Sequence, residues 1–242
     1  MRRRGGKGGA VEGGFFGVDL LMKPLIYTRA RQRMIEQQLK ARGIRDPRVL
    51  AAMADVPRER FVDPAFASQA YGDSPLPIGE RQTISQPYTV ALMLEALELE
   101  GPETVLEVGT GTGYQAAVLS KLVARVYTIE RHLALSVRAR SLLEELGCMN
   151  VVVKQGDGTL GWREHAPFDA IVVAAGGPSA PPTLLDQLSE GGRLVMPLGE
   201  MERQELYRFR KTASGVDAES LGGVRFVPLI GRFGWDRSRT ET

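Results

Sequence analysis

The chain has 242 residues, of which 43% are hydrophobic and 25% are charged, a composition typical of a globular protein with a substantial core. Its one cysteine excludes a disulfide framework and a cysteine metal cluster, and its two histidines leave little for a histidine metal site, so we expect no metal. The formal net charge of +2 gives no reason to expect a polyanionic partner.

The first 22 residues are rich in glycine and arginine and account for the whole net charge, so the rest of the chain is neutral and we expect no nucleic-acid partner. Asp19 interrupts their apolar positions, unlike in a signal peptide. No run approaches the roughly 20 apolar residues that span a bilayer, so we expect a cytoplasmic protein without a membrane partner. We interpret residues 1–22 as a flexible extension and residues 23–242 as a single domain.

Three predicted helices precede the first buried strand. Thr28–Leu39 has a helical pattern that ends at Gly43, and Pro47–Ala54 forms a second helix. A loop punctuated by proline and glycine follows over Asp63–Gln86. A third helix begins near Pro87. Its apolar face, which we expect in the core, carries Val90, Leu94 and Leu97.

Apolar strands then alternate with helices, a pattern typical of a parallel sheet with right-handed crossovers. The predicted strands are Thr104–Val108, Arg125–Ile129, Val151–Val153, Ala170–Val173 and Arg193–Met196. The helix after the first strand places Tyr114, Val118 and Leu122 on one stripe. The helix over about His132–Leu146 ends at Gly147. We expect it to bury Leu135, Ala139, Leu142 and Leu146.

Two late segments, Glu205–Arg210 and Val224–Val227, alternate apolar and polar residues and predict a closing antiparallel pair. The fold class is therefore α/β: an N-terminal helical preface, a doubly wound, mostly parallel sheet, and a C-terminal antiparallel strand pair. We expect the order 3-2-1-4-5 for the five parallel strands. This order reverses between strands one and four, where ligands bind above the strand ends.

Glycine stands at every second position directly after the first predicted strand, at Gly109, Gly111 and Gly113. A strand that enters such a turn and then a helix lets a ligand lie against bare backbone. The pattern predicts a nucleotide-like cofactor. The structural alternative is that these glycines only permit close packing of the helix against the strand.

Carboxylates around this turn narrow the choice of cofactor. Glu130 ends the second strand, where a carboxylate can accept both hydroxyls of a ribose, in NAD and S-adenosylmethionine alike. Glu107 lies inside the apolar strand, where it needs donors or a cation such as the methionine ammonium; the alternative is a strand-end glutamate that reaches solvent. Asp157 and Gly158 follow the third strand, although Asp-Gly also forms ordinary turns.

With these three elements, the chain resembles class I S-adenosylmethionine-dependent methyltransferases, which have a Rossmann-like fold. Within that class, segments 71–79 and 82–87 resemble the substrate loop of the protein-L-isoaspartate O-methyltransferase family, and segments 168–173, 187–194 and 225–229 match the family in order. The most specific element is Thr83-Ile84-Ser85-Gln86-Pro87. On this resemblance, residues 23–100 form a helical cap with the substrate loop, and residues 101–242 form the cofactor-binding core.

The resemblance implies methyl transfer from S-adenosylmethionine to the free α-carboxylate of L-isoaspartyl residues in damaged proteins and peptides, which initiates their repair. It makes Ser85 the catalytic residue, which also binds substrate. The implied cofactor-binding residues are Thr83 and Ile84, which flank the cofactor, Gly109, Gly111 and Gly113 near its methionine portion, Glu130 at the ribose, and Asp157 with Gly158 at the adenine. Glu107 is the further cofactor-binding residue, toward the methionine ammonium. The implied isoaspartyl pocket includes Val227, Pro228 and Leu229. We expect a monomer whose partners are isoaspartyl-containing proteins.

An α-carboxyl group has a pKa of about 3.3 to 3.7, so the acceptor is already anionic at neutral pH and needs no general base. We therefore expect Ser85 to position the acceptor by a hydrogen bond, since no histidine lies in a motif that would activate a nucleophilic serine. The structural alternative is that Ser85 caps the following helix.

Other functions fit part of the pattern. A class I methyltransferase for a small molecule would share the turn, but one acting on a neutral hydroxyl would need a base or a metal. An NAD-dependent dehydrogenase fits the turn and Glu130 alone. A noncatalytic module could retain the cofactor fold without turnover. A nucleic-acid amino-methyltransferase would carry an Asn/Asp-Pro-Pro-aromatic element after the fourth strand, where this chain has Ala174-Ala175-Gly176-Gly177-Pro178.

Overall fold

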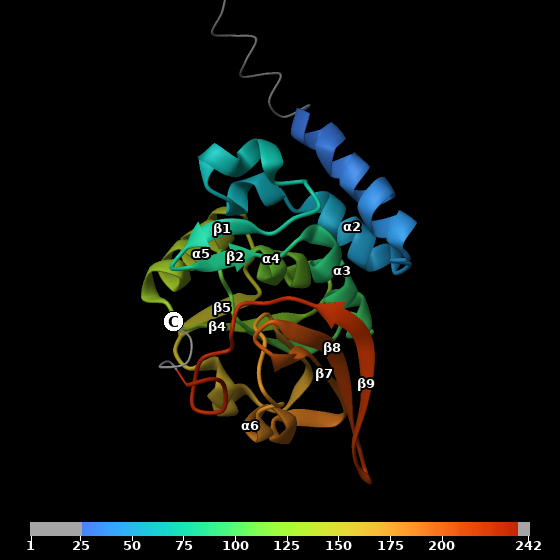
Figure 1. The fold of residues 1–242 in the computed structure, drawn as a ribbon, viewed down its shortest axis with the longest axis vertical. Helices are drawn as coiled ribbons and strands as arrows, with labels where there is room; N and C mark the ends of the chain where they lie inside the picture. Colours follow the sequence, from blue (N-terminus) through green and yellow to red (C-terminus); the bar gives the residue numbers. More distant parts are fainter. Residues whose placement is uncertain (1–25, 237–242) are drawn as a thin grey trace, which may run out of the picture.

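A computed structural model describes residues 26–236 and has a central seven-stranded sheet (Figure 1). The strand order is β5-β4-β3-β6-β7-β8-β9, and the first five strands in this order are mutually parallel. The strands are β3 (Thr104–Val108), β4 (Arg125–Glu130), β5 (Val151–Gln155), β6 (Phe168–Val173), β7 (Leu188–Glu200), β8 (Arg203–Thr212) and β9 (Gly215–Val224). The predicted α/β class and the 3-2-1-4-5 order of the parallel strands are confirmed.

The closing antiparallel pair is confirmed in kind but not in position. β8 contains the predicted segment Glu205–Arg210, whereas its partner is β9 and not Val224–Val227. β9 lies at the sheet edge with almost all of its side chains exposed, so it has no apolar alternation by which it could be recognised. Residues 225–227 belong to no strand, and the Phe226 amide donates to the side chain of Gln204 over 2.8 Å.

Helices cover the two faces of the sheet unequally. The larger core cluster lies under the preface, which is the helical region before β3 and includes α2 (Pro47–Asp55) and α3 (Pro87–Ala96), and under α4 (Tyr114–Ser120) and α5 (Leu133–Glu145). The smaller cluster lies on the opposite face, under α6 (Pro182–Asp186) and the 3-10 helices η5 (Gly158–Leu160) and η6 (Arg163–His165). Side chains of β3 alternate between the clusters, with Val105 in the first and Leu106 in the second. Both faces of the parallel sheet are thus buried.

The predicted apolar face of α5 is wrong in part. Leu135 and Ala139 are buried as expected, but the stripe continues through Leu143, while Leu142 and Leu146 are only half-buried. The spacing of four residues from 135 to 143 keeps these side chains in one row, and Leu142 and Leu146 lie beside it. On α3, all three predicted core residues are buried.

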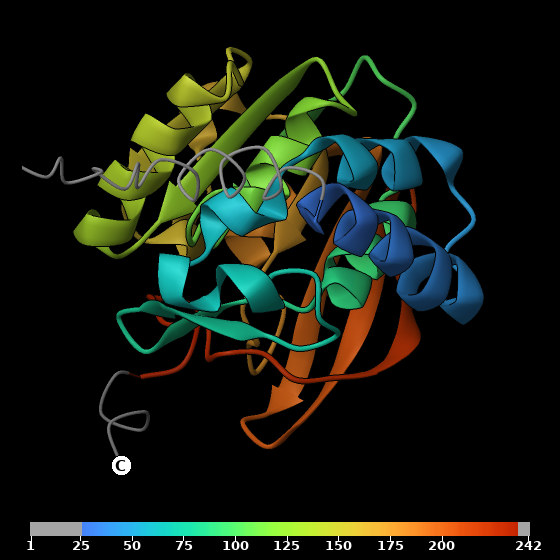
Figure 2. The same ribbon diagram turned by 90° about the horizontal axis from the view of Figure 1, so that it is seen from above.

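The first helix of the preface begins with α-helix over residues 26–33, becomes π-helical over η1 (Met34–Leu39) and 3-10 over η2 (Lys40–Arg42), and ends at Gly43 as predicted. Two further 3-10 helices, η3 (Arg58–Phe61) and η4 (Pro64–Gln69), follow α2. The predicted flexible extension, residues 1–22, lies outside the described residues. Figure 2 looks onto the preface, with the strands of the sheet running behind it.

The predicted loop Asp63–Gln86 contains an antiparallel hairpin of β1 (Leu76–Gly79) and β2 (Gln82–Ile84). Its turn has positive φ at Glu80 (52°) and Arg81 (55°), residue types that do not signal such a turn, so the hairpin escaped sequence analysis. In Figure 1 the hairpin lies between the preface and the central sheet. It therefore lies over the carboxyl ends of the parallel strands.

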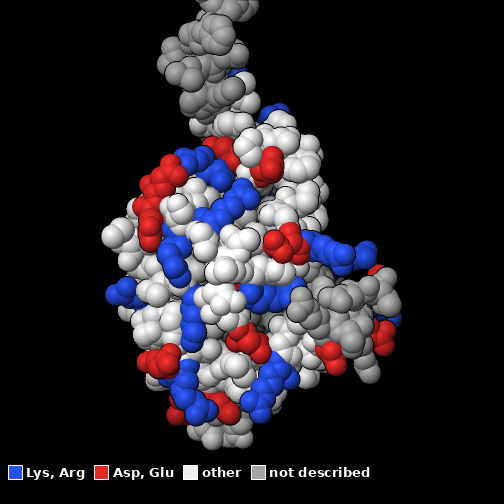
Figure 3. All heavy atoms as spheres, turned by 90° about the vertical axis from the view of Figure 1, so that its left-hand side faces the viewer, with Lys and Arg blue, Asp and Glu red and all other residues white. Residues whose placement is uncertain are grey.

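The outer surface carries charges of both signs. On the face in Figure 3, Lys and Arg alternate with Asp and Glu, and no large area of one sign stands out. Within residues 26–236, every helix is too short or too polar to cross a membrane.

Gly158 allows the segment after β5 to approach β3, and its replacement tests that contact. A Cβ added at Gly158 would lie 2.4 Å from Val108 Cγ1, so Gly158→Ala should lower the free energy of unfolding by about 1–3 kcal/mol, as overpacked cores do. The nearby variant Gly156→Ala adds the same methyl group where no atom lies within 4 Å and should be nearly neutral. Urea unfolding of both variants measures the difference, and equal stabilities would contradict the packing account.

Candidate functional site

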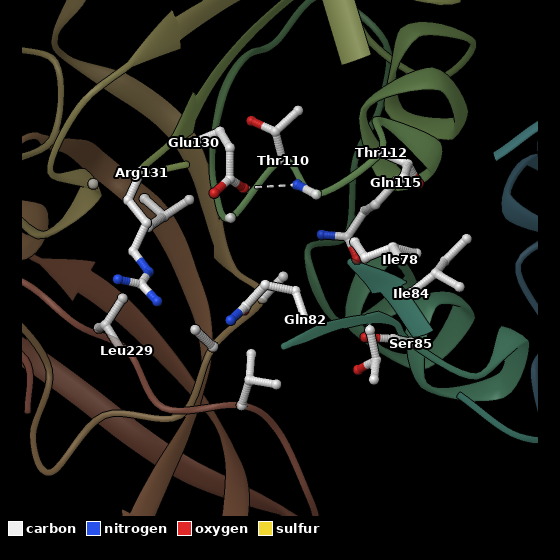
Figure 4. A pocket seen from close by; sticks show the side chains of 18 of the residues that line it. Ile78, Gln82, Ile84, Ser85, Thr110, Thr112, Gln115, Glu130, Arg131 and Leu229 are labelled. Carbon is white, nitrogen blue, oxygen red and sulfur yellow. Dashed lines mark hydrogen bonds between the residues drawn. The ribbon is translucent and has the colours of Figure 1, made fainter. Parts of the chain in front are cut away.

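A cavity lies above the carboxyl ends of β3, β4 and β6, at the point where the strand order reverses (Figure 4). The turn after β3 forms one wall, the β1–β2 hairpin a second, and residues 227–230 a third. Ten of the predicted site residues line it: Thr83, Ile84, Ser85, Gly109, Gly111, Glu130, Gly158, Val227, Pro228 and Leu229. Three others, Glu107, Gly113 and Asp157, do not line it.

The turn after β3 needs glycine for its backbone and for its close neighbours. Gly111 has φ 55°, and a Cβ there would lie 3.2 Å from Cδ1 of Ile78 in the hairpin. Gly113 has φ 93° and is the N-cap of α4, with Leu143 of α5 directly behind it. The missing side chain at Gly111 thus lets the hairpin lie close to the turn, whereas Gly113 supplies the backbone conformation from which α4 starts.

Glu130 is held in place by backbone donors. Its Oε2 accepts from the Gly111 amide and its Oε1 from the His132 amide, both over 2.9 Å. Each carboxylate oxygen can accept more than one hydrogen bond, so both retain capacity toward the cavity. Figure 4 shows the carboxylate beside the turn, with the side chain of Arg131 next to it. The geometry suits recognition of a pair of hydroxyl groups.

Glu107 is fully buried beneath the turn. Its Oε2 accepts a 2.6 Å hydrogen bond from the Thr128 hydroxyl, which in turn lies 2.6 Å from the Thr110 hydroxyl, while Oε1 has no partner. Burial raises the pKa of Glu107 to about 8, the Thr128 hydrogen bond opposes the rise, and the nearby charge of Glu130 adds to it. Burial thus favours the protonated form of Glu107, which connects to the turn through two threonine hydroxyls.

Asp157 lies next to the cavity, but its carboxylate binds other parts of the chain. One oxygen accepts from the amide and the hydroxyl of Thr159, as an N-cap does, and the other accepts from the Arg232 amide over 2.8 Å. These bonds hold the C-terminal segment against η5. Gly158 itself lines the cavity, so the two predicted adenine-site residues occupy different positions.

Sequence analysis missed several lining residues, among them Thr112 and Gln115. The Gln115 amide nitrogen and the Thr112 hydroxyl are buried and have no hydrogen-bond partner in the described chain. Figure 4 shows the Gln115 side chain at the cavity, beside Ile78 of the hairpin. Unpaired buried donors are costly, so these two atoms suit a polar ligand group. The sequence could have indicated them, because Thr112 and Gln115 are polar residues that stand directly before the apolar run of the following helix.

Ser85 lies where this cavity meets a second groove, which is also lined by Tyr88, Arg203 and Phe226. Its backbone carbonyl accepts a hydrogen bond from Arg58 over 2.7 Å. Helix α3 has Gln86 as its N-cap and makes no side-chain capping bond, so the alternative role of Ser85 as a helix cap is not observed. Within residues 26–236 no group of three potential metal ligands occurs.

Known proteins resemble the chain over most of its length. The model of a family described as protein-L-isoaspartate(D-aspartate) O-methyltransferase matches residues 29–234. Protein-L-isoaspartate O-methyltransferase 1 of Syntrophobacter fumaroxidans is 56% identical over 210 residues, 87% of this chain and 98% of that protein. The protein-L-isoaspartate O-methyltransferase of Geobacter metallireducens is 56% identical over 207 residues, 85% of this chain and 96% of that protein.

Two solved structures that resemble the chain carry the same description as these relatives. A protein-L-isoaspartate O-methyltransferase superposes with a TM-score of 0.76 at 33% identity and covers 84% of this chain and 67% of its own. A Plasmodium falciparum structure described by the same activity, in complex with S-adenosyl-L-homocysteine, has a TM-score of 0.72 at 26% identity and covers 83% of this chain and 98% of its own.

The raised pKa of Glu107 predicts a pH dependence of stability. Folded protein keeps this proton up to about pH 8, whereas unfolded chain loses it near the ordinary value of 4.5. Between these values the free energy of unfolding falls as pH rises, by at most about 1.4 kcal/mol per pH unit, and the fall ends above pH 8. Glu107→Gln removes this contribution, so its stability should fall less steeply than that of the unsubstituted protein.

Urea unfolding between pH 5.5 and 8.5 measures both slopes. Glu190→Gln, which removes an exposed carboxylate, serves as the control and should keep the original slope. Identical pH dependence of Glu107→Gln and the unsubstituted protein would show that Glu107 is ionised at neutral pH.

Proposed function

The chain belongs to the protein-L-isoaspartate(D-aspartate) O-methyltransferase family, and we propose that it performs the reaction of that family in the cavity above β3. The protein transfers a methyl group from S-adenosylmethionine to the free α-carboxylate of L-isoaspartyl residues in damaged proteins and peptides, the step that initiates their repair. The observation that carries our assignment is the meeting of the glycine turn, Glu130 and Ser85 around one cavity.

The cavity offers a suitable polar group for each polar part of the methyl donor. S-adenosylmethionine, when bound, supplies a methyl group on a positively charged sulfur. Glu130 can accept hydrogen bonds from the ribose hydroxyls while its backbone bonds fix the carboxylate in place. The unpaired donors of Gln115 and Thr112 suit the carboxylate of the methionine portion, beside Gly109 and Gly111. Thr83 and Ile84 close the cavity from the hairpin.

In this proposal the remaining predicted cofactor residues do not line the cavity but support the segments that do. Glu107 sets the turn through Thr128 and Thr110 and need not touch the donor. Gly113 provides the backbone conformation that starts α4. Asp157 orients the segment that carries Gly158, the residue we place at the adenine.

The acceptor needs orientation more than activation. Its α-carboxylate is anionic at neutral pH, so no side chain has to remove a proton. Ser85 is placed to donate a hydrogen bond to one carboxylate oxygen and to direct the other toward the donor, with Val227, Pro228 and Leu229 as the opposite wall. Orientation of this kind can contribute about 7–11 kcal/mol in favourable systems. Apolar side chains such as Ile78 and Leu229 exclude water, which favours a step in which opposite charges combine.

The finer expectations on partners and location remain predictions. We propose a monomer that binds isoaspartyl proteins and peptides, acts in the cytoplasm, and has neither a nucleic-acid nor a membrane partner. The mixed charge on the face in Figure 3 supports the absence of a nucleic-acid partner on that face.

The activity is tested with labelled S-adenosylmethionine and two peptides of the same sequence, one with isoaspartate and the other with ordinary aspartate. We expect the label only on the isoaspartyl peptide, because only there is a free α-carboxylate offered on a side branch of the backbone. Equal labelling of both peptides would contradict the specificity. Binding of S-adenosylhomocysteine without any labelling would indicate a noncatalytic module.

Ser85→Ala tests the role of the hydroxyl. Because the donor cavity and the fold do not depend on it, we expect methyl transfer to fall about 10²-fold, while the free energy of unfolding changes by less than about 0.5 kcal/mol. Initial rates at saturating donor and urea unfolding measure the two effects. Thr89→Ala, at a half-buried position of α3 that lines the neighbouring groove but not the donor cavity, is the matched control for loss of a hydroxyl and should retain the rate. Unchanged turnover in Ser85→Ala would overturn the catalytic assignment.

A further inference from the structure

Arg58, the first residue of η3, is a fully buried arginine without a carboxylate partner. Its exposed fraction is 0%, and none of the ion pairs among residues 26–236 includes it. Burial lowers the pKa of the guanidinium from its usual value. An unpaired buried charge costs several kcal/mol, so an apolar side chain of similar volume would serve stability better. The arginine therefore needs an explanation beyond packing.

The guanidinium binds both ends of the segment that carries the β1–β2 hairpin. Its Nε donates to the Ala70 carbonyl and its Nη2 to the Ser85 carbonyl, each over 2.7 Å. Nε and Nη2 form one edge of a rigid planar group, so the two carbonyls are held at a fixed spacing. Lysine has a single nitrogen on a flexible stem and cannot reproduce this edge.

The same side chain also contacts the donor cavity. Its central carbon lies 4.7 Å from the ring centroid of Tyr114, the first residue of α4, and Phe61 packs edge-on against that ring at 5.5 Å. Tyr114 directly follows Gly113 and lines the cavity. Arg58 is thus in contact with the turn side of the site through the ring and with the Ser85 side through a hydrogen bond.

We propose that Arg58 is a positioning residue for methyl transfer, which fixes the Ser85 backbone relative to the turn and so directs the Ser85 hydroxyl toward the acceptor carboxylate. This inference rests on the proposed role of Ser85. Arg58 touches neither donor nor acceptor, and its effect passes through the Ser85 carbonyl. A displacement of Ser85 by about 1 Å can cost about 10²-fold in rate, whereas the donor is held mainly by the turn, Glu130 and Gly158, none of which Arg58 contacts.

The test is Arg58→Lys, which keeps the charge and removes the two-donor edge. With isoaspartyl peptide at saturating S-adenosylmethionine, we expect kcat/KM for the peptide to fall at least about tenfold, while the Kd of S-adenosylhomocysteine changes less than about threefold. Arg58→Gln, which removes the buried charge but keeps a donor, is the second variant for the case that lysine does not fold. It should show the same split.

Arg48 provides the matched control. Its guanidinium also donates to two carbonyls, those of Leu99 (2.6 Å) and Leu122 (2.5 Å), but it lies outside the cavity. Arg48→Lys should lose stability and keep the peptide kinetics of each folded molecule. If Arg58→Lys likewise loses only stability, its role is purely structural and the inference is overturned.

A double-variant cycle shows whether Arg58 acts through Ser85. If it does, Arg58→Lys combined with Ser85→Ala should be no more than about threefold slower than Ser85→Ala alone, because the positioned group is already gone. Losses that multiply would overturn the inference while leaving the role of Ser85 intact. Unchanged turnover in Ser85→Ala alone would overturn the role of Ser85 and this inference with it.

Discussion

The carboxyl end of β3 is the constraint on which the rest of the structure depends. One strand flanks β3 on each side, β4 and β6, and the chain passes from β3 into α4 through only the five residues 109–113. Positive φ at Gly111 and Gly113 permits this turn. The cavity lies above this turn and is also lined by the ends of β4 and β6 and the residues that follow them. Every group that we assign to the reaction either lines this cavity or positions a residue that does.

Unpaired and weakly paired buried polar groups gather around the turn. Glu107 lies beneath it with one oxygen unsatisfied, Gln115 and Thr112 have unpaired donors beside it, and Arg58 lies behind Tyr114 without a counterion. Such groups cost stability, and their concentration at one place is typical of a site organised for a ligand. The helical preface contributes to this organisation through Arg58, although it lies outside the parallel sheet.

The sequence was sufficient for the parts of the fold that are buried on both faces. The parallel strands are continuous apolar runs with glycine turns, so their positions and order could be predicted. The β1–β2 hairpin and β9 could not: the first turns at Glu80 and Arg81, and the second is an exposed edge strand. Their structure depends on tertiary contacts that no local pattern records.

The same distinction holds for the site. Residues in a recognisable motif, such as Ser85 and Glu130, were predicted and line the cavity. Gln115 was missed because one polar residue in an apolar helix resembles ordinary variation, and Arg58 was missed because its partners are backbone carbonyls 12 and 27 residues away. The internal bonds of Asp157 to Thr159 and Arg232 could not be predicted, because one of them is made by the distant C-terminal segment.

The most direct test of the central claim is a crystal structure of the protein with S-adenosylhomocysteine. Our account predicts the adenosyl group in the cavity above β3, with the ribose hydroxyls within hydrogen-bonding distance of Glu130 and the amino-acid carboxylate at Gln115 and Thr112. Ligand density outside this cavity, or a ribose that makes no contact with Glu130, would contradict it.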